Sequence, residues 1–381
     1  MIKILHIIKT LDLGGAETNL FNLVTAFDKG SFDHHVAYSS GGEIEDRFLA
    51  EEIPLFMFAE SPHKLKSPAS VGIIARLALY IIRNKIDIIQ SHSFNGHVWG
   101  GLAARLAGRK VIEHVHDGRY HDPADYYRRR GNFTQQRFAK YFTWLSDAVV
   151  VLTGQNRKYL IDKGLQCENK LFHIMNGIPL PQADIAVENR QRLMEKFALP
   201  HDSFVISTLS RMSAEKNIAL ILRIAPLVKR LIPSAVFVIA GNGPLLGDFL
   251  ETALRSKAYN IRFTGFCDKP AELLSVSDLF LLPSFLELHS IALLEAMSMG
   301  IPVITSRDVG SNNDFITHKV NGFLLDPFKD DGWAETIADL WHDPDLLNSI
   351  GRSGYETCVR NFDINFTARK FENLYESLIV K

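Results

Sequence analysis

Short apolar runs rich in β-branched residues alternate with segments of helical periodicity along almost the whole chain. This alternation is typical of parallel sheets covered by helices on both faces. Seven runs precede the segment Gly177-Ile-Pro-Leu-Pro181, whose turn and prolines suit a linker, and six follow it. The predicted strands are Ile2 to Ile8, His35 to Ser39, Leu55 to Phe58, Ile86 to Gln90, Val111 to His114, Ala148 to Leu152, Leu171 to Ile174, Val205 to Leu209, Ala235 to Ala240, Ile261 to Thr264, Leu279 to Leu282, Pro302 to Thr305 and Phe323 to Leu325. We therefore expect an α/β fold with two doubly wound domains.

The length and composition suit two domains with complete cores, because 381 residues include 46% hydrophobic and 22% charged side chains. We place an N-terminal domain at residues 1–180 and a C-terminal domain at 181–362. The final segment, 363–381, is expected to be a helix that packs back on the N-terminal domain.

Charge is distributed unevenly along the chain. Residues 1–183 contain 22 Lys and Arg against 18 Asp and Glu, a net charge of +4, whereas the rest of the chain carries −5. Ten of the 14 histidines also lie in the first part. This mild asymmetry suits an anionic ligand or an anionic membrane surface near the N-terminal half. It falls short of the strongly basic domain that nucleic acid requires, so no nucleic-acid partner is expected.

The cysteines indicate a reducing compartment. Cys167, Cys267 and Cys358 lie far apart and show neither a CxxC motif nor metal-ligand spacing with histidine. We predict no disulfide framework and no zinc site, which fits the cytoplasm. His6 and Lys9 interrupt the apolar N-terminus, and we interpret it as a buried strand rather than a signal peptide.

Ligands of open α/β sheets bind beyond the carboxyl ends of the strands, so the loops that follow strands are the informative ones. In the first domain, Gly14-Gly15 follows the first strand and lets the backbone approach a ligand closely. His116 follows the fifth strand, where an imidazole can donate to a sugar oxygen or transfer a proton. The alternatives are a tight turn at the glycines and a satisfied polar residue at His116, beside His114 and Asp117.

Two cations follow the first strand of the second domain, Arg211 and Lys216. They can neutralise a diphosphate, and the arginine adds a bidentate fork. Solvated surface charges are the alternative, which the position after a buried strand disfavours. The turn Gly241-Asn-Gly243-Pro244 resembles half of a dinucleotide fingerprint, but Pro244 occupies the helix opening. A tight turn that lines a nucleotide is therefore favoured over a hydride-transferring Rossmann enzyme.

Two glutamates, Glu287 and Glu295, lie around the start of an apolar helical stretch that ends at Gly300. A helix N-terminus offers N–H groups to an anion, and carboxylates near it can accept hydrogen bonds from sugar hydroxyls. Residues eight apart on one helix lie about 12 Å apart along its axis, beyond the roughly 5 Å of a retaining glycosidase pair, and only a non-helical start at Glu287 would shorten that. We assign both to binding and electrostatics rather than hydrolysis. A surface helix with two solvated glutamates is the alternative, and the apolar surroundings argue against it.

Eight motifs resemble, in the right order, those of the retaining family 4 glycosyltransferases. They are GGAE at 14–17, the His116 loop, NG at 176–177, LSRMSAEKN at 209–217, AGNGP at 240–244, FTGF at 263–266, the two glutamates with EAMSMGIPVITS at 295–306, and NGFLL at 321–325. The similarity covers nearly the whole chain. Such enzymes have the GT-B fold, in which two facing Rossmann-like domains hold the active site in the cleft between them. The C-terminal domain binds a nucleotide sugar and the N-terminal domain binds the acceptor, without a metal.

The resemblance also implies roles for particular residues. Arg211 and Lys216 would bind the diphosphate, Glu295 the ribose hydroxyls and Glu287 the donor sugar. Backbone near Gly265 and Phe266 would contact the base, His116 would lie near the sugar 6-hydroxyl, and Gly15 would approach the diphosphate. The predicted catalytic residues are Arg211, Lys216, Glu287 and His116; the predicted donor-binding residues are Gly15, Asn176, Gly243, Gly265, Phe266, His289, Ser290, Ile291 and Glu295.

The chain departs from the family pattern at two places. Leu288-His289-Ser290 stands where the family usually has Gly-Phe-Gly, and Gly310-Ser-Asn-Asn-Asp314 stands where it has a Gly-Gly turn followed by Pro-Glu. The first departure changes side chains beside the phosphate and sugar, so it bears most directly on which donor is used.

The function implied is retaining, metal-independent transfer of a hexose from a nucleotide sugar, with UDP-glucose as the first candidate, to a saccharide or lipid-linked acceptor. Cell-surface polysaccharide biosynthesis is the expected setting, and no cofactor is expected because the nucleotide sugar is a substrate. A nucleotide-sugar 2-epimerase of the same architecture is the alternative. An inactive nucleotide-binding module is disfavoured by the presence of both cations and both glutamates.

A basic and aromatic segment follows His116, with Tyr126-Tyr127-Arg128-Arg129-Arg130 and Arg137-Phe138-Ala139-Lys140. Aromatic and basic residues together suit the surface of an anionic membrane, where each basic residue contributes about 1 kcal/mol of attraction. A solvated charged face is the alternative. We expect a cytoplasmic protein that is peripheral on the inner face of the membrane.

Overall fold

The computed structural model describes residues 1–381 except 13, 60–68, 117–140, 182–189, 257–258 and 380–381. The described residues form two compact units. The first contains residues up to Pro179 together with Asp363–Lys381, and the second contains Leu180–Phe362. The basic and aromatic segment after His116 lies outside the described residues. Among those described, no helix is both long and apolar enough to cross a bilayer.

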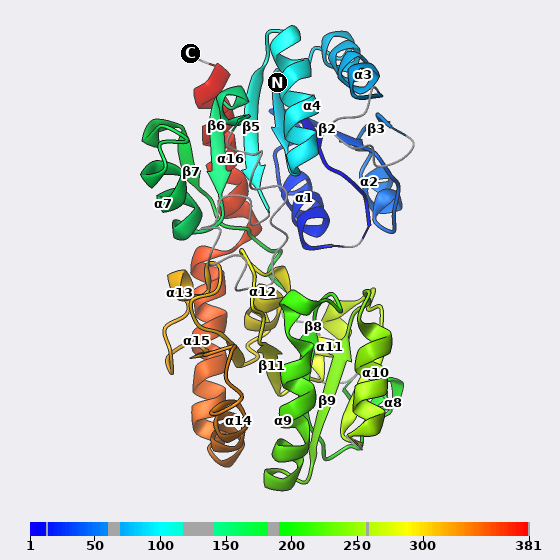
Figure 1. Ribbon diagram of the computed structural model, residues 1–381, viewed down its shortest axis with the longest axis vertical. Helices are drawn as coiled ribbons and strands as arrows, with labels where there is room; N and C mark the ends of the chain where they lie inside the picture. The colour runs from blue at the N-terminus through cyan, green and yellow to red at the C-terminus, as the bar shows by residue number, and fades with distance from the viewer. Residues whose placement is uncertain (13, 60–68, 117–140, 182–189, 257–258, 380–381) are drawn as a thin grey trace. The chain divides into compact units, whose positions relative to one another are not determined.

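The first unit is built on a seven-stranded parallel sheet in the order β3-β2-β1-β4-β5-β6-β7 (Figure 1). Helices α1 and α16 share a core cluster with one face of this sheet, and α3 and α4 share one with the other face. The strands are β1 (Ile2–Ile7), β2 (Phe32–Tyr38), β3 (Leu55–Met57), β4 (Ile88–Ser91), β5 (Lys110–Val115), β6 (Ala148–Val151) and β7 (Leu171–His173). The helices are α1 (Gly15–Thr25), α2 (Glu45–Ala50), α3 (Ala69–Arg83), α4 (Phe94–Leu106), α7 (Gly154–Asp162) and α16 (Ile364–Ile379), with short 3₁₀ turns η2 (Thr143–Leu145) and η3 (Glu168–Lys170).

The second unit has a six-stranded parallel sheet in the order β10-β9-β8-β11-β12-β13. Helices α9 and α14 pack in the larger core cluster, and α8 and α11 pack in a smaller cluster on the other face. The strands are β8 (Phe204–Leu209), β9 (Ala235–Ala240), β10 (Ile261–Gly265), β11 (Leu279–Leu282), β12 (Val303–Ser306) and β13 (Phe323–Leu325). The helices are α8 (Arg190–Lys196), α9 (Ile218–Leu231), α10 (Leu246–Arg255), α11 (Pro270–Ser275), α12 (Ile291–Ser298), α13 (Asn312–Phe315), α14 (Trp333–His342) and α15 (Pro344–Asn361), with the 3₁₀ turn η5 (Ala214–Lys216).

All thirteen predicted strands are present, and the two doubly wound sheets are confirmed. The largest error in a strand end is at β2, which begins at Phe32 rather than His35. Phe32 pairs with Ile2 of β1 and is buried. In the sequence, the polar residues Asp33 and His34 separate it from the apolar run, so the sequence pattern places the start of the strand too late.

Helix α16 belongs to the first unit although it lies at the end of the sequence. Phe371, Leu374 and Tyr375 are buried in the same cluster as Ile4 of β1. The Tyr375 hydroxyl donates to Gln90 Oε1 of β4 at 2.6 Å. The helix therefore completes one face of the first sheet.

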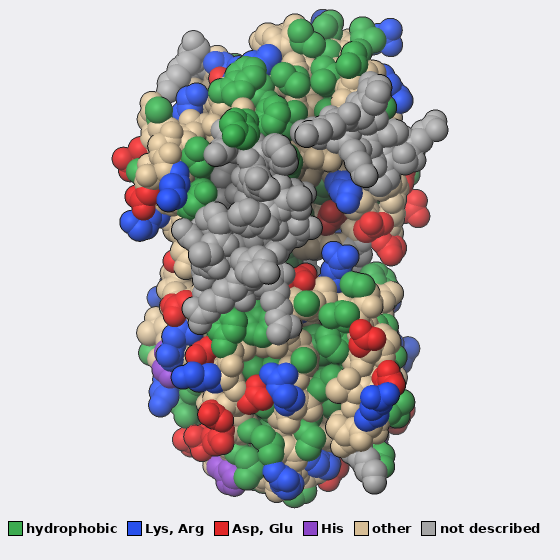
Figure 2. Space-filling view, viewed as in Figure 1, with side chains coloured by type: hydrophobic (Ala, Val, Ile, Leu, Met, Phe, Trp, Pro, Cys, Tyr) green, Lys and Arg blue, Asp and Glu red, His purple; other side chains and the backbone are tan. Residues whose placement is uncertain are grey.

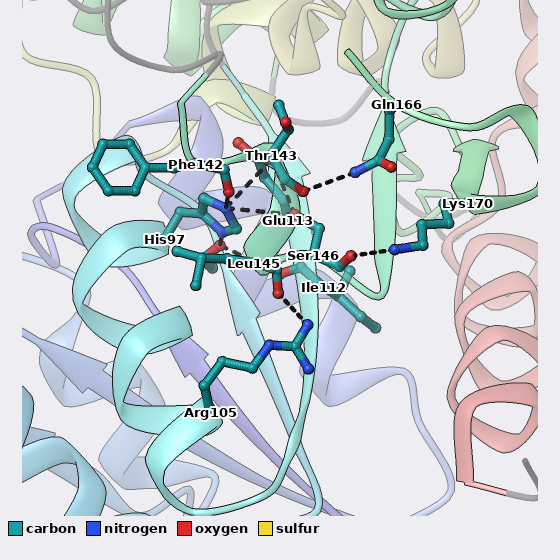
Figure 3. Close-up of polar contacts among 11 residues, drawn as sticks. His97, Arg105, Ile112, Glu113, Phe142, Thr143, Leu145, Ser146, Gln166 and Lys170 are labelled. Carbon is teal, nitrogen blue, oxygen red and sulfur yellow. Dashed lines mark hydrogen bonds and ion pairs between the residues drawn. The ribbon is translucent and has the colours of Figure 1, made fainter. Parts of the chain in front are cut away.

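Side chains from other segments hold residues 142–146, which lead into β6, through hydrogen bonds to backbone carbonyl groups. Four side chains donate to four carbonyls of residues 142–146 (Figure 3). The pairs are His97 with Phe142 at 3.3 Å, Gln166 with Thr143 at 2.9 Å, Arg105 with Leu145 at 2.7 Å and Lys170 with Ser146 at 3.1 Å. The η2 turn already pairs the carbonyls of Phe142 and Thr143, and the side chains add partners for those of Leu145 and Ser146, which fixes where β6 begins.

Charges are interspersed on the surface of the second unit. Figure 2 shows Lys and Arg side chains next to Asp and Glu side chains over the face that carries α9, α10 and α14. Such a mixture creates no broad basic field on that face.

The packing of α16 generates a stability prediction. Replacing Phe371, which is 1% exposed, by Ala should lower the free energy of unfolding by about 3–5 kcal/mol, because it leaves a cavity in the core. Phe366→Ala is the matched control, since Phe366 lies on the same helix but is 42% exposed. Urea denaturation measures both variants. Equal losses would show that α16 does not anchor the core of the first unit.

Candidate functional site

Arg211 lies on a loop that is locked by backbone contacts to the next loop of the second sheet. Ser210 N donates to Ala240 O at 3.0 Å, and Met212 N donates to Asn242 O at 2.9 Å. Leu245 N then donates back to Met212 O at 3.0 Å. Arg211 is exposed, and its side chain makes no ion pair with any described residue. A fixed backbone thus presents a cation to solvent.

The loop can pack this closely because its neighbour contains two glycines. Gly241 has φ of +133°, and a Cβ there would lie 1.9 Å from Ser210 O. A Cβ on Gly243 would lie 2.6 Å from Met212 O. Only glycine permits both approaches, so Gly243 supports the Arg211 loop whether or not it also lines a ligand.

Lys216 and Glu287 form an ion pair between two loops at the carboxyl edge of the second sheet. Lys216 Nζ lies 2.6 Å from Glu287 Oε1, and the side chains are 20% and 10% exposed. Ser284 Oγ donates to the same carboxylate oxygen at 2.9 Å, and Phe285 N donates to Glu215 O at 2.8 Å. The bonds between these loops hold the cation and the carboxylate in place.

Glu287 and Glu295 do not lie on one helix, because Glu287 lies before the helical start, the alternative that the sequence left open. Helix α12 begins at Ile291, so Glu287 lies in the preceding loop and Glu295 lies in the second turn. The separation of about 12 Å along a helix axis therefore does not apply. The ion pair with Lys216 gives Glu287 an electrostatic role.

The N-terminus of α12 retains backbone donors that no described residue bonds. The Ser290 side chain accepts from Leu293 N at 3.3 Å, and Leu294 N donates to Ser290 O at 3.2 Å. The backbone N–H groups of Ile291 and Ala292 make no hydrogen bond to another described residue. Two donors at the positive end of the helix dipole are the arrangement that binds anions.

The loop before α12 rests on an aromatic cluster and on Gly310. His289 is 5% exposed and packs against Phe315 and Phe362, with ring centroids 5.4 and 5.2 Å apart. A Cβ on Gly310, whose φ is +56°, would lie 2.5 Å from the carbonyl oxygens of Glu287 and Leu288. His289 therefore packs in the core as an aromatic side chain would. Gly310 permits the close contact between its own backbone and the backbone of Glu287 and Leu288.

Gly265 and Phe266, which the sequence also predicts to bind the donor, lie at the carboxyl edge of the second sheet. Gly265 ends β10 with φ of +68°, and its carbonyl accepts from Gly241 N at 2.7 Å. Phe266 follows it and is 45% exposed. Phe266 therefore offers an exposed ring face beside the Gly241 turn.

In the first unit, Gly15 begins α1, and Gly14 caps it in an extended conformation. The Glu17 side chain folds back so closely that a Cβ on Gly14 would lie 2.4 Å from Glu17 Oε2. Burial raises the pKa of Glu17 to about 7. Asn176, also predicted, lies after β7 and is 4% exposed.

His116 follows β5 and lies at one end of a row of hydrogen-bonded histidines among the described residues. Its Nε2 lies 3.0 Å from His92 Nδ1, and His92 Nε2 lies 3.1 Å from His6 Nδ1. Ring nitrogens of His92, His114 and His116 also lie within 4.8 Å of one another, a spacing that a transition metal can bridge. Because both ring nitrogens of His92 already bond to other imidazoles, the geometry is that of a hydrogen-bonded chain.

A separate hollow of the second unit, about 330 Å³, is lined by Arg190, Asp278 and Gly300, among others. Asp278 precedes β11 and Pro302, also in the lining, precedes β12. The hollow therefore lies at the amino edge of the sheet, away from the loops that carry Arg211 and Glu287.

Two family models together match most of the chain. One, described as "Glycosyl transferases group 1", matches residues 189–357, and the other, "Glycosyltransferase Family 4", matches residues 13–181. The chain is a family 4, group 1 glycosyltransferase.

Solved structures show that this glycosyltransferase has the GT-B fold, as expected. HepE of Anabaena, in complex with UDP and glucose, matches with a TM-score of 0.87 at 20% identity, covering 99% of this chain and 100% of that one. Sucrose-phosphate synthase of Thermosynechococcus elongatus matches with a TM-score of 0.81 at 17% identity, covering both chains fully.

A curated relative is similar over the full length. The Escherichia coli protein named UDP-Gal:alpha-D-GlcNAc-diphosphoundecaprenol alpha-1,3-galactosyltransferase is 25% identical over 385 aligned positions, covering 100% of this chain and 98% of the relative. The epimerase alternative has no support in these comparisons.

Several residues that shape the site escaped the sequence reasoning. Ser284 and Gly310 hold Glu287, while His6 and His92 hold His116. The excess of histidines in the first half of the chain was the one available signal for the second pair.

The glycine contacts predict a matched pair of variants. Gly241→Ala should destabilise this glycosyltransferase by about 1–3 kcal/mol, since it combines a strained φ with a clash against Ser210 O. Gly247→Ala, six residues later in α10, should be neutral or stabilising, because a Cβ there meets nothing within 4 Å. Thermal unfolding compares them, and an unchanged Tm for Gly241→Ala would contradict the tight loop packing.

Proposed function

We propose that this glycosyltransferase moves a hexose from a UDP-sugar to a saccharide or lipid-linked saccharide acceptor, with retention at the anomeric carbon and without a metal. UDP-glucose is the first candidate donor, and cell-surface polysaccharide biosynthesis is the proposed setting. The observation that carries the proposal is the grouping of Arg211, the Lys216–Glu287 pair and the first N–H groups of α12, which no described residue bonds, at one edge of the second sheet.

The relatives support this choice of substrates. The name of the E. coli relative contains UDP-Gal and a diphosphoundecaprenol-linked sugar, and the HepE complexes contain UDP, glucose or UDP-glucose. UDP-glucose and UDP-galactose are therefore both candidate donors.

The proposed mechanism places the growing negative charge of the leaving diphosphate against groups that are already oriented. Lys216 is held by Glu287, and Arg211 is held by the bonds of Ser210 and Met212 to the next loop. Prepositioned positive groups lower the barrier because they need no reorganisation as the charge develops. The leaving phosphate takes the acceptor proton, so no side chain need act as the nucleophile.

The carboxylates would divide the polar contacts of the donor. Glu287, next to Lys216, would accept from the sugar hydroxyls, and Glu295, in the second turn of α12, would accept from the ribose. In the first unit, Gly15, His116 and Asn176 lie after β1, β5 and β7, at the edge where α/β sheets bind ligands. His116 would meet the sugar near its 6-hydroxyl.

The donor is identified by incubating the protein with UDP-glucose, UDP-galactose, GDP-sugars and ADP-sugars in the presence of EDTA. Thermal unfolding measures binding, because a ligand that binds the native state raises Tm. NMR of the transferred sugar reports the anomeric configuration, which should match that of the donor. Protection by GDP- or ADP-sugars alone, an inverted product or loss of transfer with EDTA would each overturn the corresponding part of the proposal.

Removing either cation of the site, Arg211 or Lys216, is expected to lower turnover. Arg211→Ala and Lys216→Ala should each lower kcat by on the order of a hundredfold, because each removes charge stabilisation that grows in the transition state. Arg230→Ala serves as the control, since Arg230 is an exposed cation in the last turn of α9. Steady-state kinetics at saturating acceptor separates them. Near-normal turnover in both site variants would place the diphosphate elsewhere.

The glutamates predict different losses of binding. Glu295→Ala should weaken UDP and the UDP-sugar alike, whereas Glu287→Ala should impair use of the sugar more than it weakens UDP, which it affects only through the lost partner of Lys216. Calorimetry with UDP and with the UDP-sugar measures both. Equal losses of UDP affinity would refute the division between ribose and sugar contacts.

A further inference from the structure

Four histidines of the first unit lie in, or directly after, four neighbouring strands. His34 lies in β2, His6 lies in β1, His92 directly follows β4 and His116 directly follows β5. The register pairs Ile4 with His34 and His6 with Gln90, and each further step of two residues keeps the same face of the sheet. The histidines therefore form a diagonal row across one face.

Ring-to-ring hydrogen bonds connect the row without a break. His34 Nδ1 lies 2.9 Å from His6 Nε2, His6 Nδ1 lies 3.1 Å from His92 Nε2, and His92 Nδ1 lies 3.0 Å from His116 Nε2. Every bond joins the Nδ1 of one ring to the Nε2 of the next. His6 and His92 use both of their ring nitrogens.

Burial favours the neutral form of the inner rings. Burial lowers the pKa of His6 and of His92 well below 6.5, and it lowers the pKa of His34 to about 3. A neutral imidazole has one N–H donor and one acceptor nitrogen. Because each bond needs one of each, the direction of the first bond sets the direction of all, and neutral rings must share one tautomer.

We propose that His92, His6 and His34 are positioning residues that fix the orientation and the tautomer of His116. The functional part of this inference rests on the proposed role of His116 at the donor sugar. The chain presents His116 to a ligand as a hydrogen-bonding group of fixed polarity.

The tautomer cannot reverse by proton movement along the chain. Moving each shared proton across its bond would leave His34 with either two ring protons or none, and both forms are charged. His34 is 7% exposed and lies among the rings of Phe27, Phe32 and Tyr375, an environment that disfavours charge. The buried His34 end therefore locks the tautomer at the His116 end.

NMR tests the chain without any assay of activity. In protein labelled with ¹⁵N-histidine, long-range ¹H–¹⁵N correlations at pH 7 distinguish the Nδ1–H tautomer, the Nε2–H tautomer and the cation. Single-histidine variants assign the signals. We expect His6, His34, His92 and His116 to be neutral and to share one tautomer. Opposite tautomers in two bonded neighbours, or a cationic ring among His34, His6 and His92, would overturn the proposal.

Variants of His6 test the effect on transfer. His6→Phe removes both bonds and should lower kcat between about tenfold and a hundredfold while leaving UDP affinity unchanged, because misplacing a group at the sugar affects the reaction more than nucleotide binding. His6→Gln keeps a donor and an acceptor and should retain more of the kcat. His35→Phe is the matched control: His35 is 5% exposed on the same sheet but bonds to Tyr80 outside the chain.

Thermal unfolding of each variant separates a folding defect from a positioning effect. A wild-type kcat in folded His6→Phe, or equal losses in His6→Phe and His35→Phe, would reject the positioning role. If the wild-type protein transfers from no UDP-sugar, the proposed function fails, and the NMR result still decides whether the chain sets the tautomer of His116.

Discussion

Parallel pairing of strands is the constraint on which both the charged site of the second unit and the histidine row of the first unit depend. It brings the carboxyl ends of all strands in a sheet to one edge, so loops that are distant in sequence become neighbours. Lys216 and Glu287 are 71 positions apart, yet their charged atoms lie 2.6 Å apart because β8 pairs with β11. In the first unit the same pairing aligns His34, His6, His92 and His116.

Backbone contacts make the charged loops of the second unit rigid. Gly241 and Gly243 allow the β9 loop to touch the backbone on either side of Arg211, and Gly310 allows a similar contact with Glu287. Side chains that are held in this way need little rearrangement when charge develops on a ligand. The glycines thus contribute to electrostatics through geometry rather than through any charge of their own.

The polar groups of the two units differ in charge. The second unit offers an exposed arginine, a paired lysine and the N-terminus of α12, all of which favour an anion. The first unit offers buried imidazoles that burial keeps neutral, together with a carboxyl of Glu17 whose pKa is raised to about 7.

The sequence by itself determined the thirteen strands, the two sheets and the family, because buried parallel strands are continuous apolar runs and the motifs follow them in order. It also located Arg211, Lys216 and Glu287 on loops after strands. Only the tertiary structure decided that Glu287 precedes α12 and pairs with Lys216, that His289 packs on Phe315, and that four histidines form one chain. These features depend on strand order, register and close packing between distant segments, which local periodicity does not encode.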